Sequence, residues 1–507
     1  MKWIRYLPLV LGVLAAPAAA QEPLSAIDWL SKSVREKPVA APVAPDVSGP
    51  IQSPEITVTP LAGIRKDTVG LLPSAVTGLP PDFWGGSNTE TITRLISRQR
   101  TDSLPEVLSL LYTILLAEVN APGGALSGSD LLLARTDKLL DLGALNQAQA
   151  LLERAGPNEP EIFRRWFDIS LLTGHEEHAC TAMRAAPGFA PTMEARVFCL
   201  ARGGDWDAAA LTLATGETLG FIKQSKADLI TRFLDPQMFE GQPDLPPPTP
   251  LTPLEFTMRE AIAQPRPAGA LPLAFANVDL RSGIAWRNQM RAAERLVRSQ
   301  AVPARRLIEF YTQRKPAASG GIWDRVRAIQ AFDVALLSGD NAGIDLTLPT
   351  AYNAMREVAL EVPFARYYGD RLAGRVFSKA TTKTAFKIAL LSDGFENSAR
   401  KLVATSDRQA FLKGLALGNV AGLTPPGTLG QAIADAFEKP MPEGSLRDLL
   451  TEKRLGEAIL RTMLLLKDES FADPGDIRAA LSTFRAVGLE QEARRIAIQL
   501  LLLERLG

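Results

Sequence analysis

The two histidines of the chain lie close together and near a cysteine, in a grouping that can bind a metal. His175 and His178 are three residues apart, and Cys180 follows two residues later. Residues three apart lie on adjacent turns of a helix, so two imidazoles there can share a zinc ion with a thiolate. The zinc-protease pattern needs histidines four apart, and the chain has no third histidine. We therefore interpret the segment as a solvated helix start and expect no metal and no other cofactor.

The sequence also lacks the short motifs of common nucleophilic and nucleotide-binding sites. It contains no Gly-x-Ser-x-Gly elbow, no Walker loop and no glycine-rich dinucleotide fingerprint. The sequence does not exclude a catalytic carboxylate pair of the glycosidase type, because 56 acidic residues allow many pairings whose separation the sequence does not give. We expect no catalytic residues and no enzymatic activity, with an undetected hydrolase as a third alternative.

The histidines and cysteines lie within a pattern that occurs three times between about residues 131 and 216. Each copy has an apolar helix end, a glycine, an alanine five residues on, a larger apolar residue nine on and a small residue twelve on. The copies are Gly143/Ala148/Leu152/Ala155, Gly174/Ala179/Met183/Ala186 and Gly204/Ala209/Leu213/Gly216. Their glycines are 31 and 30 residues apart, a period typical of stacked helical hairpins. The glycine would end the first helix, and the alanine would let the second approach it closely.

The first twenty residues have the three parts of a secretory signal peptide. Lys2 and Arg5 provide a basic start, residues 6–16 form an apolar run, and three alanines end at position 20. The run is shorter than the roughly 20 residues that span a bilayer, which favours cleavage before Gln21 over an uncleaved membrane anchor. We expect a periplasmic protein without a transmembrane segment after cleavage, and full secretion is the second choice.

Cys180 and Cys199 are the only cysteines of the chain, and an oxidising periplasm favours a disulfide between them. In the repeat pattern, Cys180 lies early in the second helix of copy two and Cys199 late in the first helix of copy three. The turn between these helices is centred at residue 189, close to the midpoint of the two cysteines. Antiparallel helices joined there would bring the cysteines together. The predicted bond would add roughly 3 kcal/mol by restricting the unfolded chain.

The remaining sequence divides the chain by composition. Residues 21–86 are rich in proline and alanine and are expected to be a disordered linker. Trp29 within it either makes a local contact with the folded body or anchors a linear motif for a partner. A repeat lobe is predicted at 87–240, a Pro-rich linker at 241–253, and a second all-helical lobe at 254–507. The predicted fold is an all-α solenoid of antiparallel hairpins in two lobes.

The net charge and the aromatic residues indicate which kinds of partner the protein binds. Lys plus Arg and Asp plus Glu are both 56, so the net charge is zero and no nucleic-acid footprint is visible. Most aromatic residues of the second half are core candidates. The adjacent pair Tyr367 and Tyr368 either belongs to that core or lines a groove that binds a partner.

The first repeat copy resembles a tetratricopeptide repeat, which has Leu-Gly in its first helix, Ala in its second and Pro at the exit. The matching positions are Leu142, Gly143, Ala148, Leu152 and Ala155, followed by Pro157, with Pro187 after the second copy. The resemblance covers about 90 of 507 residues, and the period of 30–31 departs from the usual value of about 34. It implies a concave surface that binds proteins.

These observations predict a non-enzymatic scaffold or assembly factor for cell-envelope proteins of unknown identity. The alternative is an accessory or binding subunit of an envelope enzyme that processes peptidoglycan. Architecture alone does not decide between them, because one fold can serve many functions.

Overall fold

The computed structural model describes residues 65–124, 128–246, 250–264, 271–466 and 473–503. Regular structure in these ranges is helical, and the only strand-like pairings described there are isolated bridges from Leu72 to Ala117 and from Asn88 to Gly123. The predicted all-α class is confirmed. The predicted signal peptide, Trp29 and most of the predicted disordered linker lie outside the described residues.

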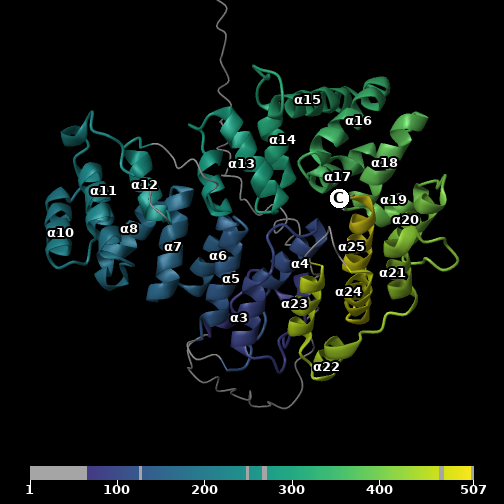
Figure 1. Cartoon of the computed structure of the whole chain (residues 1–507), viewed down its shortest axis with the longest axis horizontal. Helices are drawn as coiled ribbons and strands as arrows, with labels where there is room; N and C mark the ends of the chain where they lie inside the picture. The colour runs from purple at the N-terminus through teal and green to yellow at the C-terminus, as the bar shows by residue number, and fades with distance from the viewer. Residues whose placement is uncertain (1–64, 125–127, 247–249, 265–270, 467–472, 504–507) are drawn as a thin grey trace, which may run out of the picture. The chain divides into compact units, whose positions relative to one another are not determined.

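The first helices are short and follow one another closely along the chain (Figure 1). They are α2 (Ser74–Thr77), α3 (Thr89–Ser97), α4 (Pro105–Leu116), α5 (Asp130–Asp141), α6 (Leu145–Ala155), α7 (Pro160–Thr173), α8 (Glu176–Ala185), α9 (Met193–Arg202), α10 (Trp206–Thr218), α11 (Gln224–Leu234) and α12 (Pro253–Ala261). Short 3-10 turns are η1 (Lys66–Thr68), η2 (Pro187–Phe189), η3 (Gln237–Phe239) and η4 (Leu273–Leu280).

The later helices include the longest ones in the described part of the chain. They are α13 (Trp286–Arg298), α14 (Ala304–Thr312), α15 (Ile322–Ser338), α16 (Asn341–Arg356), α17 (Glu361–Leu372), α18 (Lys379–Leu391), α19 (Phe395–Lys401), α20 (Asp407–Leu417), α21 (Gly427–Glu438), α22 (Gly444–Thr451), α23 (Leu455–Leu465), α24 (Pro474–Ala486) and α25 (Glu490–Leu502).

Helices α5 to α10 form three successive hairpins, α5/α6, α7/α8 and α9/α10, and each hairpin packs on the next. Their turns contain Gly143, Gly174 and Gly204 with φ of 75°, 80° and 83°. This left-handed conformation favours glycine, because other side chains clash there with the backbone. The alanines five residues after each glycine are fully buried, at positions Ala148, Ala179 and Ala209. The repeat pattern thus corresponds to helical hairpins.

Local capping fixes where the third hairpin begins and turns. The hydroxyl of Thr192 accepts a hydrogen bond from the backbone N–H of Ala195 at 3.1 Å, at the start of α9. Asp205 accepts from the backbone N–H of Ala208 at 3.2 Å, at the start of α10. Such side chains satisfy N–H groups that have no partner within the helix, so each stabilises a helix start.

Folded structure begins earlier than residue 87, where the sequence placed it. Phe83 and Trp84 are almost completely buried, although they lie in the segment predicted to be a linker. The Asp67 carboxylate accepts a hydrogen bond from the backbone N–H of Leu132 at 2.9 Å, and Arg135 donates to the carbonyl oxygen of Val69 at 2.8 Å. Residues 65–86 therefore pack on the helices, because their few large apolar side chains outweigh the proline-rich composition.

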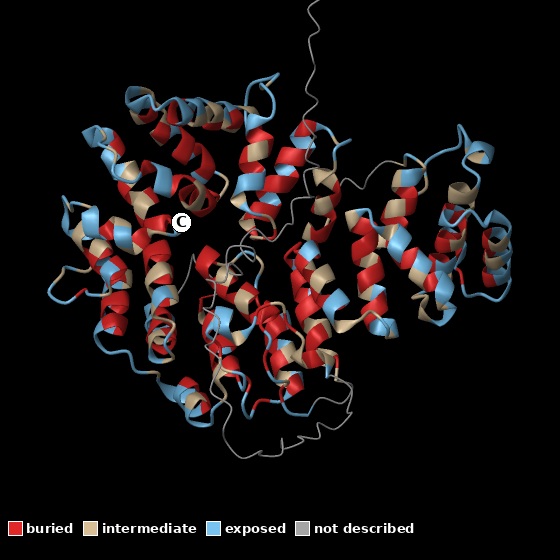
Figure 2. Ribbon diagram, turned by 180° about the vertical axis from the view of Figure 1, so that it is seen from behind, coloured by how far each residue is buried: buried red, intermediate tan, exposed pale blue. Residues whose placement is uncertain are grey.

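The first helices of the described chain share a core with the last ones. Helix α3 packs on α23, and α4 packs on α25 (Figure 1). The Gln99 amide donates to the carbonyl oxygen of Leu460 at 3.0 Å, and the Ser87 hydroxyl donates to the buried carboxylate of Glu457 at 2.9 Å. Figure 2 shows buried residues along most helices of the described chain, these included. The N-terminal helices thus depend on the end of the chain for burial.

Helices on the two sides of the predicted 241–253 linker are also in contact. Helix α12 and turn η4 both pack on α7. The Asn277 side chain donates to the carbonyl oxygen of Gly143 at 2.9 Å, and Arg281 donates to the carbonyl oxygens of Leu171 and Leu172, each at 3.1 Å. The helices after the Pro-rich segment thus cover one side of the first two hairpins. The division into two lobes stays a prediction.

Candidate functional site

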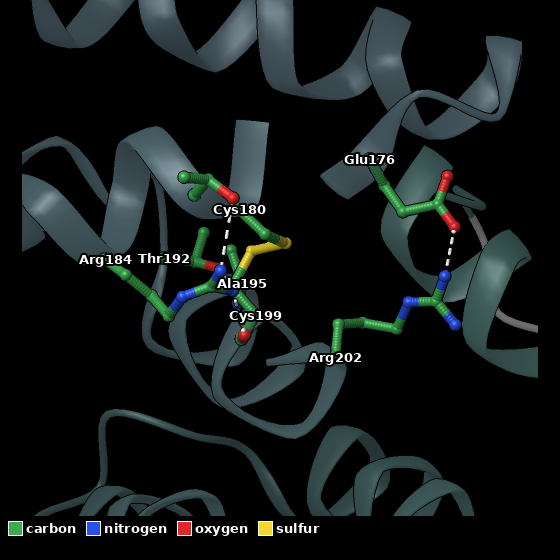
Figure 3. The surroundings of a disulfide bond; sticks show 8 residues. Glu176, Cys180, Arg184, Thr192, Ala195, Cys199 and Arg202 are labelled. Carbon is green, nitrogen blue, oxygen red and sulfur yellow. Dashed lines mark hydrogen bonds and ion pairs between the residues drawn. A yellow bond between two sulfur atoms is a disulfide. The ribbon is translucent and has the colours of Figure 1, made fainter. Parts of the chain in front are cut away.

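A disulfide joins Cys180 on α8 to Cys199 on α9, and it links the second hairpin to the third (Figure 3). The two Cα atoms are 4.9 Å apart, and both side chains are fully buried. This is the pairing that the hairpin spacing predicted. The bond closes a loop of 19 residues, which restricts the unfolded chain and stabilises the fold by about 3 kcal/mol.

An ion pair connects the same two helices near the disulfide. Arg202, in the last turn of α9, donates to the carboxylate of Glu176, in the first turn of α8, at 2.9 Å. Each of these side chains has a charge opposite to the partial charge of its own helix end, so each is also stabilised by its own helix. Arg184 also donates to the backbone carbonyl oxygen of Cys199 at 3.2 Å, as Figure 3 shows. Helices α8 and α9 are therefore held together at three points.

The metal site considered at His175, His178 and Cys180 loses its thiolate ligand to this disulfide. Both histidines are exposed. Within the part of the chain that the structure describes, no group of three or more His, Cys, Asp and Glu side chains is arranged to hold a metal ion.

Of the two tyrosines predicted as candidate contacts for a partner, Tyr368 lies in the core instead. It is fully buried, its ring lies 5.0 Å from Phe332, and its hydroxyl donates to Asp333 at 3.0 Å. Tyr367 is half-buried, with the Arg371 guanidinium 4.8 Å above its ring. Neighbours on a helix face directions about 100° apart, and the sequence does not tell which of the two faces inward.

The sequence did not single out the outer side of α10, which carries exposed apolar residues. Helix α10 packs mainly on α9 and α11, where it buries Ala209, Leu213 and Gly216. Its other side carries the exposed residues Trp206, Ala210, Leu211 and Ala214, which we call the α10 surface. Trp206 is 51% exposed and Leu211 is 70% exposed.

A signal for this surface exists in the sequence. Apolar residues on α10 occupy more positions than one buried stripe requires, so some of them must face outward. Single exposed apolar side chains are ordinary, whereas adjacent ones on one helix face form a candidate interaction surface. Figure 1 shows α10 at the outer edge of the three hairpins.

Among the described helices, none combines the length and the apolar content that crossing a bilayer requires. Comparisons with protein-family models, with curated proteins and with solved structures find no match to this chain.

Proposed function

We propose that the protein is a non-enzymatic scaffold of tetratricopeptide-like helical hairpins that binds a cell-envelope protein in the periplasm. The observation that carries this proposal is the α10 surface. Outer helices of repeat arrays ordinarily present a polar face to water, whereas this one presents Trp206, Leu211 and two alanines. Covering such a surface with a partner removes apolar area from water and favours association.

The chemistry of the α10 surface favours one kind of occupant, a helix of a partner protein. Ala210 and Ala214 are one turn apart, and small side chains there let another helix approach closely. Exposed acidic residues flank the surface, Asp207 at the start of α10 and Glu217 near its end. The proposed partner helix therefore has an apolar face with basic residues at its ends.

A second copy of this chain fits the α10 surface less well. Two α10 helices packed antiparallel would set Asp207 of each copy near Glu217 of the other, and parallel packing would set identical acids side by side. Like charges facing each other across an interface cost several kcal/mol. The charge pattern thus favours a different protein.

The periplasmic location rests on the predicted signal peptide and is supported by the disulfide. Buried disulfides persist in oxidising compartments and are rare in the reducing cytosol. Because Cys180 and Cys199 hold together the hairpins that carry α10, oxidation stabilises the part of the fold that presents the surface.

The test compares variants of two leucines that are both mostly exposed. Leu211→Glu places a charge in the α10 surface, and Leu346→Glu, at a side chain 78% exposed on α16, is the matched control. Each tagged protein is cross-linked in the envelope of its own cells, and the captured proteins are identified by mass spectrometry. We expect a partner captured by the native protein and by Leu346→Glu to be lost with Leu211→Glu.

Equal capture by all three proteins would exclude the α10 surface as the binding site. Direct binding of the purified protein to peptidoglycan free of protein would contradict the scaffold function and favour the alternative of a subunit that binds peptidoglycan.

A further inference from the structure

A cavity of about 250 Å³ lies among helices α7, α9, α11 and α12. Apolar side chains form much of its wall, including Phe167, Leu229, Leu254 and Met258. Typical small-molecule pockets enclose about 300–1,000 Å³, so this cavity suits a single side chain better than a whole metabolite.

Three carboxylates line the cavity, and two of them are already used by the fold. Glu194 pairs with Lys226 at 3.1 Å, and Glu255 accepts hydrogen bonds from the backbone N–H and hydroxyl of Thr252, at 3.0 Å and 2.9 Å. The third carboxylate, of Asp168, makes no hydrogen bond and no ion pair within the described residues. Asp168 is thus the carboxylate of this cavity that is left to meet a ligand.

The surroundings of Asp168 raise the free energy of its charged form. Burial raises the pKa of this carboxyl from 3.8 to about 6, although Arg164 and Arg165 on the same helix act in the opposite direction. Arg165 is engaged elsewhere, with Asp137 at 2.6 Å and Glu161 at 3.0 Å. Arg164 lines the cavity itself, but among the described contacts it makes no ion pair with Asp168. A cation that enters the cavity would compensate this desolvated carboxylate.

We propose that the cavity binds the side chain of a lysine or arginine that projects from an extended segment of a partner protein. The apolar walls suit the methylene groups of such a side chain, and Asp168 suits its charged end. This inference rests on the proposed protein-binding function and names a second contact point, separate from the α10 surface.

The surface beside the cavity favours a peptide over a free amine. A second hollow of about 550 Å³ shares Thr192, Glu194 and Lys226 with the cavity, and its wall includes Met193 and the exposed ring of Phe221. The two hollows continue along the N-terminal ends of α9 and α11. Residues that flank the basic side chain can therefore lie in the second hollow.

The test uses the purified protein and labelled synthetic heptapeptides with mixed flanking residues and one fixed central residue. Peptides centred on lysine or arginine should bind about tenfold more tightly than peptides centred on norleucine, because a charged hydrogen bond is added. Asp168→Asn should remove this preference, whereas the control Asp228→Asn, at an exposed acid on α11, should keep it. Circular dichroism checks that both variants are folded.

Other results of the peptide-binding assay would contradict the proposed site for a basic side chain. Equal binding of lysine and norleucine peptides, or an unchanged preference in folded Asp168→Asn, would overturn the proposal. Butylamine that competes as strongly as the lysine peptide would show a site for free amines and not for a protein segment. Because these assays need no α10 contact, their failure would leave the Leu211→Glu test of the scaffold function intact.

Discussion

The side-chain oxygen of Gln499, near the end of α25, accepts a hydrogen bond from the backbone N–H of Glu106 in the first turn of α4, at 3.0 Å. Leu104, which precedes α4, provides no side-chain cap. A side chain from the other end of the chain thus performs the capping that a serine or aspartate usually performs locally.

Replacing Gln499 with leucine should leave the buried N–H of Glu106 without an acceptor. The free energy of unfolding should fall by about 1–3 kcal/mol, the cost of a buried unsatisfied donor. Urea denaturation measures this change. The control is Gln431→Leu, because Gln431 is exposed on α21 and bonds only to Asp435 of its own helix among the described contacts. Equal losses in the two variants would exclude capping by Gln499.

Removing the disulfide should destabilise the protein without abolishing the fold. The double variant Cys180→Ala and Cys199→Ala should lose about 3 kcal/mol of unfolding free energy. Reductant should destabilise the native protein by a similar amount and leave the variant unchanged, as thermal unfolding in both conditions can measure. Two titratable thiols in protein purified from the periplasm and denatured without reductant would contradict the bond.

The turn glycines should differ in their tolerance of alanine. Gly143 and Gly204 both have positive φ, so alanine costs about 1 kcal/mol at either. At Gly143, however, a Cβ would lie 2.7 Å from Leu296 and 3.0 Å from Leu273, whereas at Gly204 it would meet nothing within 4 Å. Overpacking should add about 1–3 kcal/mol to the loss for Gly143→Ala alone. Chemical denaturation of the two variants checks this, and equal losses would count against close packing of η4 and α13 on the first hairpin.

Asp168 should make stability fall as pH rises through a defined window. Its carboxyl ionises near pH 3.8 in the reference state and near 6 in the folded protein. Between these values the folded protein holds a proton that the unfolded chain has released, so raising the pH lowers the free energy of unfolding. Asp168→Asn has no such proton. The melting temperature of the variant minus that of the native protein should therefore rise from about pH 4 to about pH 6 and then level off. A pH-independent difference would contradict the burial of this carboxyl.

The sequence predicted what depends on neighbours along the chain. The recurrence of glycine and alanine placed the three hairpins, and the midpoint between Cys180 and Cys199 placed them on facing helices, because both follow from local helix geometry. The contacts that join distant segments were not predicted. The residues around Glu106 do not indicate that Gln499 will accept its backbone hydrogen bond. Trp84 is buried because it packs against Gly456, which lies far away in the sequence.

The candidate binding surfaces were missed for a related reason. Whether Leu211 is exposed or buried depends on whether another helix covers it, and the apolar count of α10 alone does not say which side is covered. In the sequence, Asp168 likewise does not differ from the many other acidic residues. Its burial and its raised pKa follow from the packing of α9, α11 and α12 around it. For Tyr368 the core is the alternative that the structure shows, because its ring packs on Phe332 of α15 and on Phe364, one turn earlier on α17.

The packing of α4 on α25 has a consequence for the order of events during synthesis. Helix α4 is apolar on nearly every side, and α25, which covers one of these sides, is made almost 400 residues later. The side of α4 that packs on α25 therefore stays exposed in a growing chain until α25 has been made. Premature termination before α25 leaves that side of α4 uncovered, so chains that lack α25 should be captured by chaperones or degraded, while chains that contain it escape both.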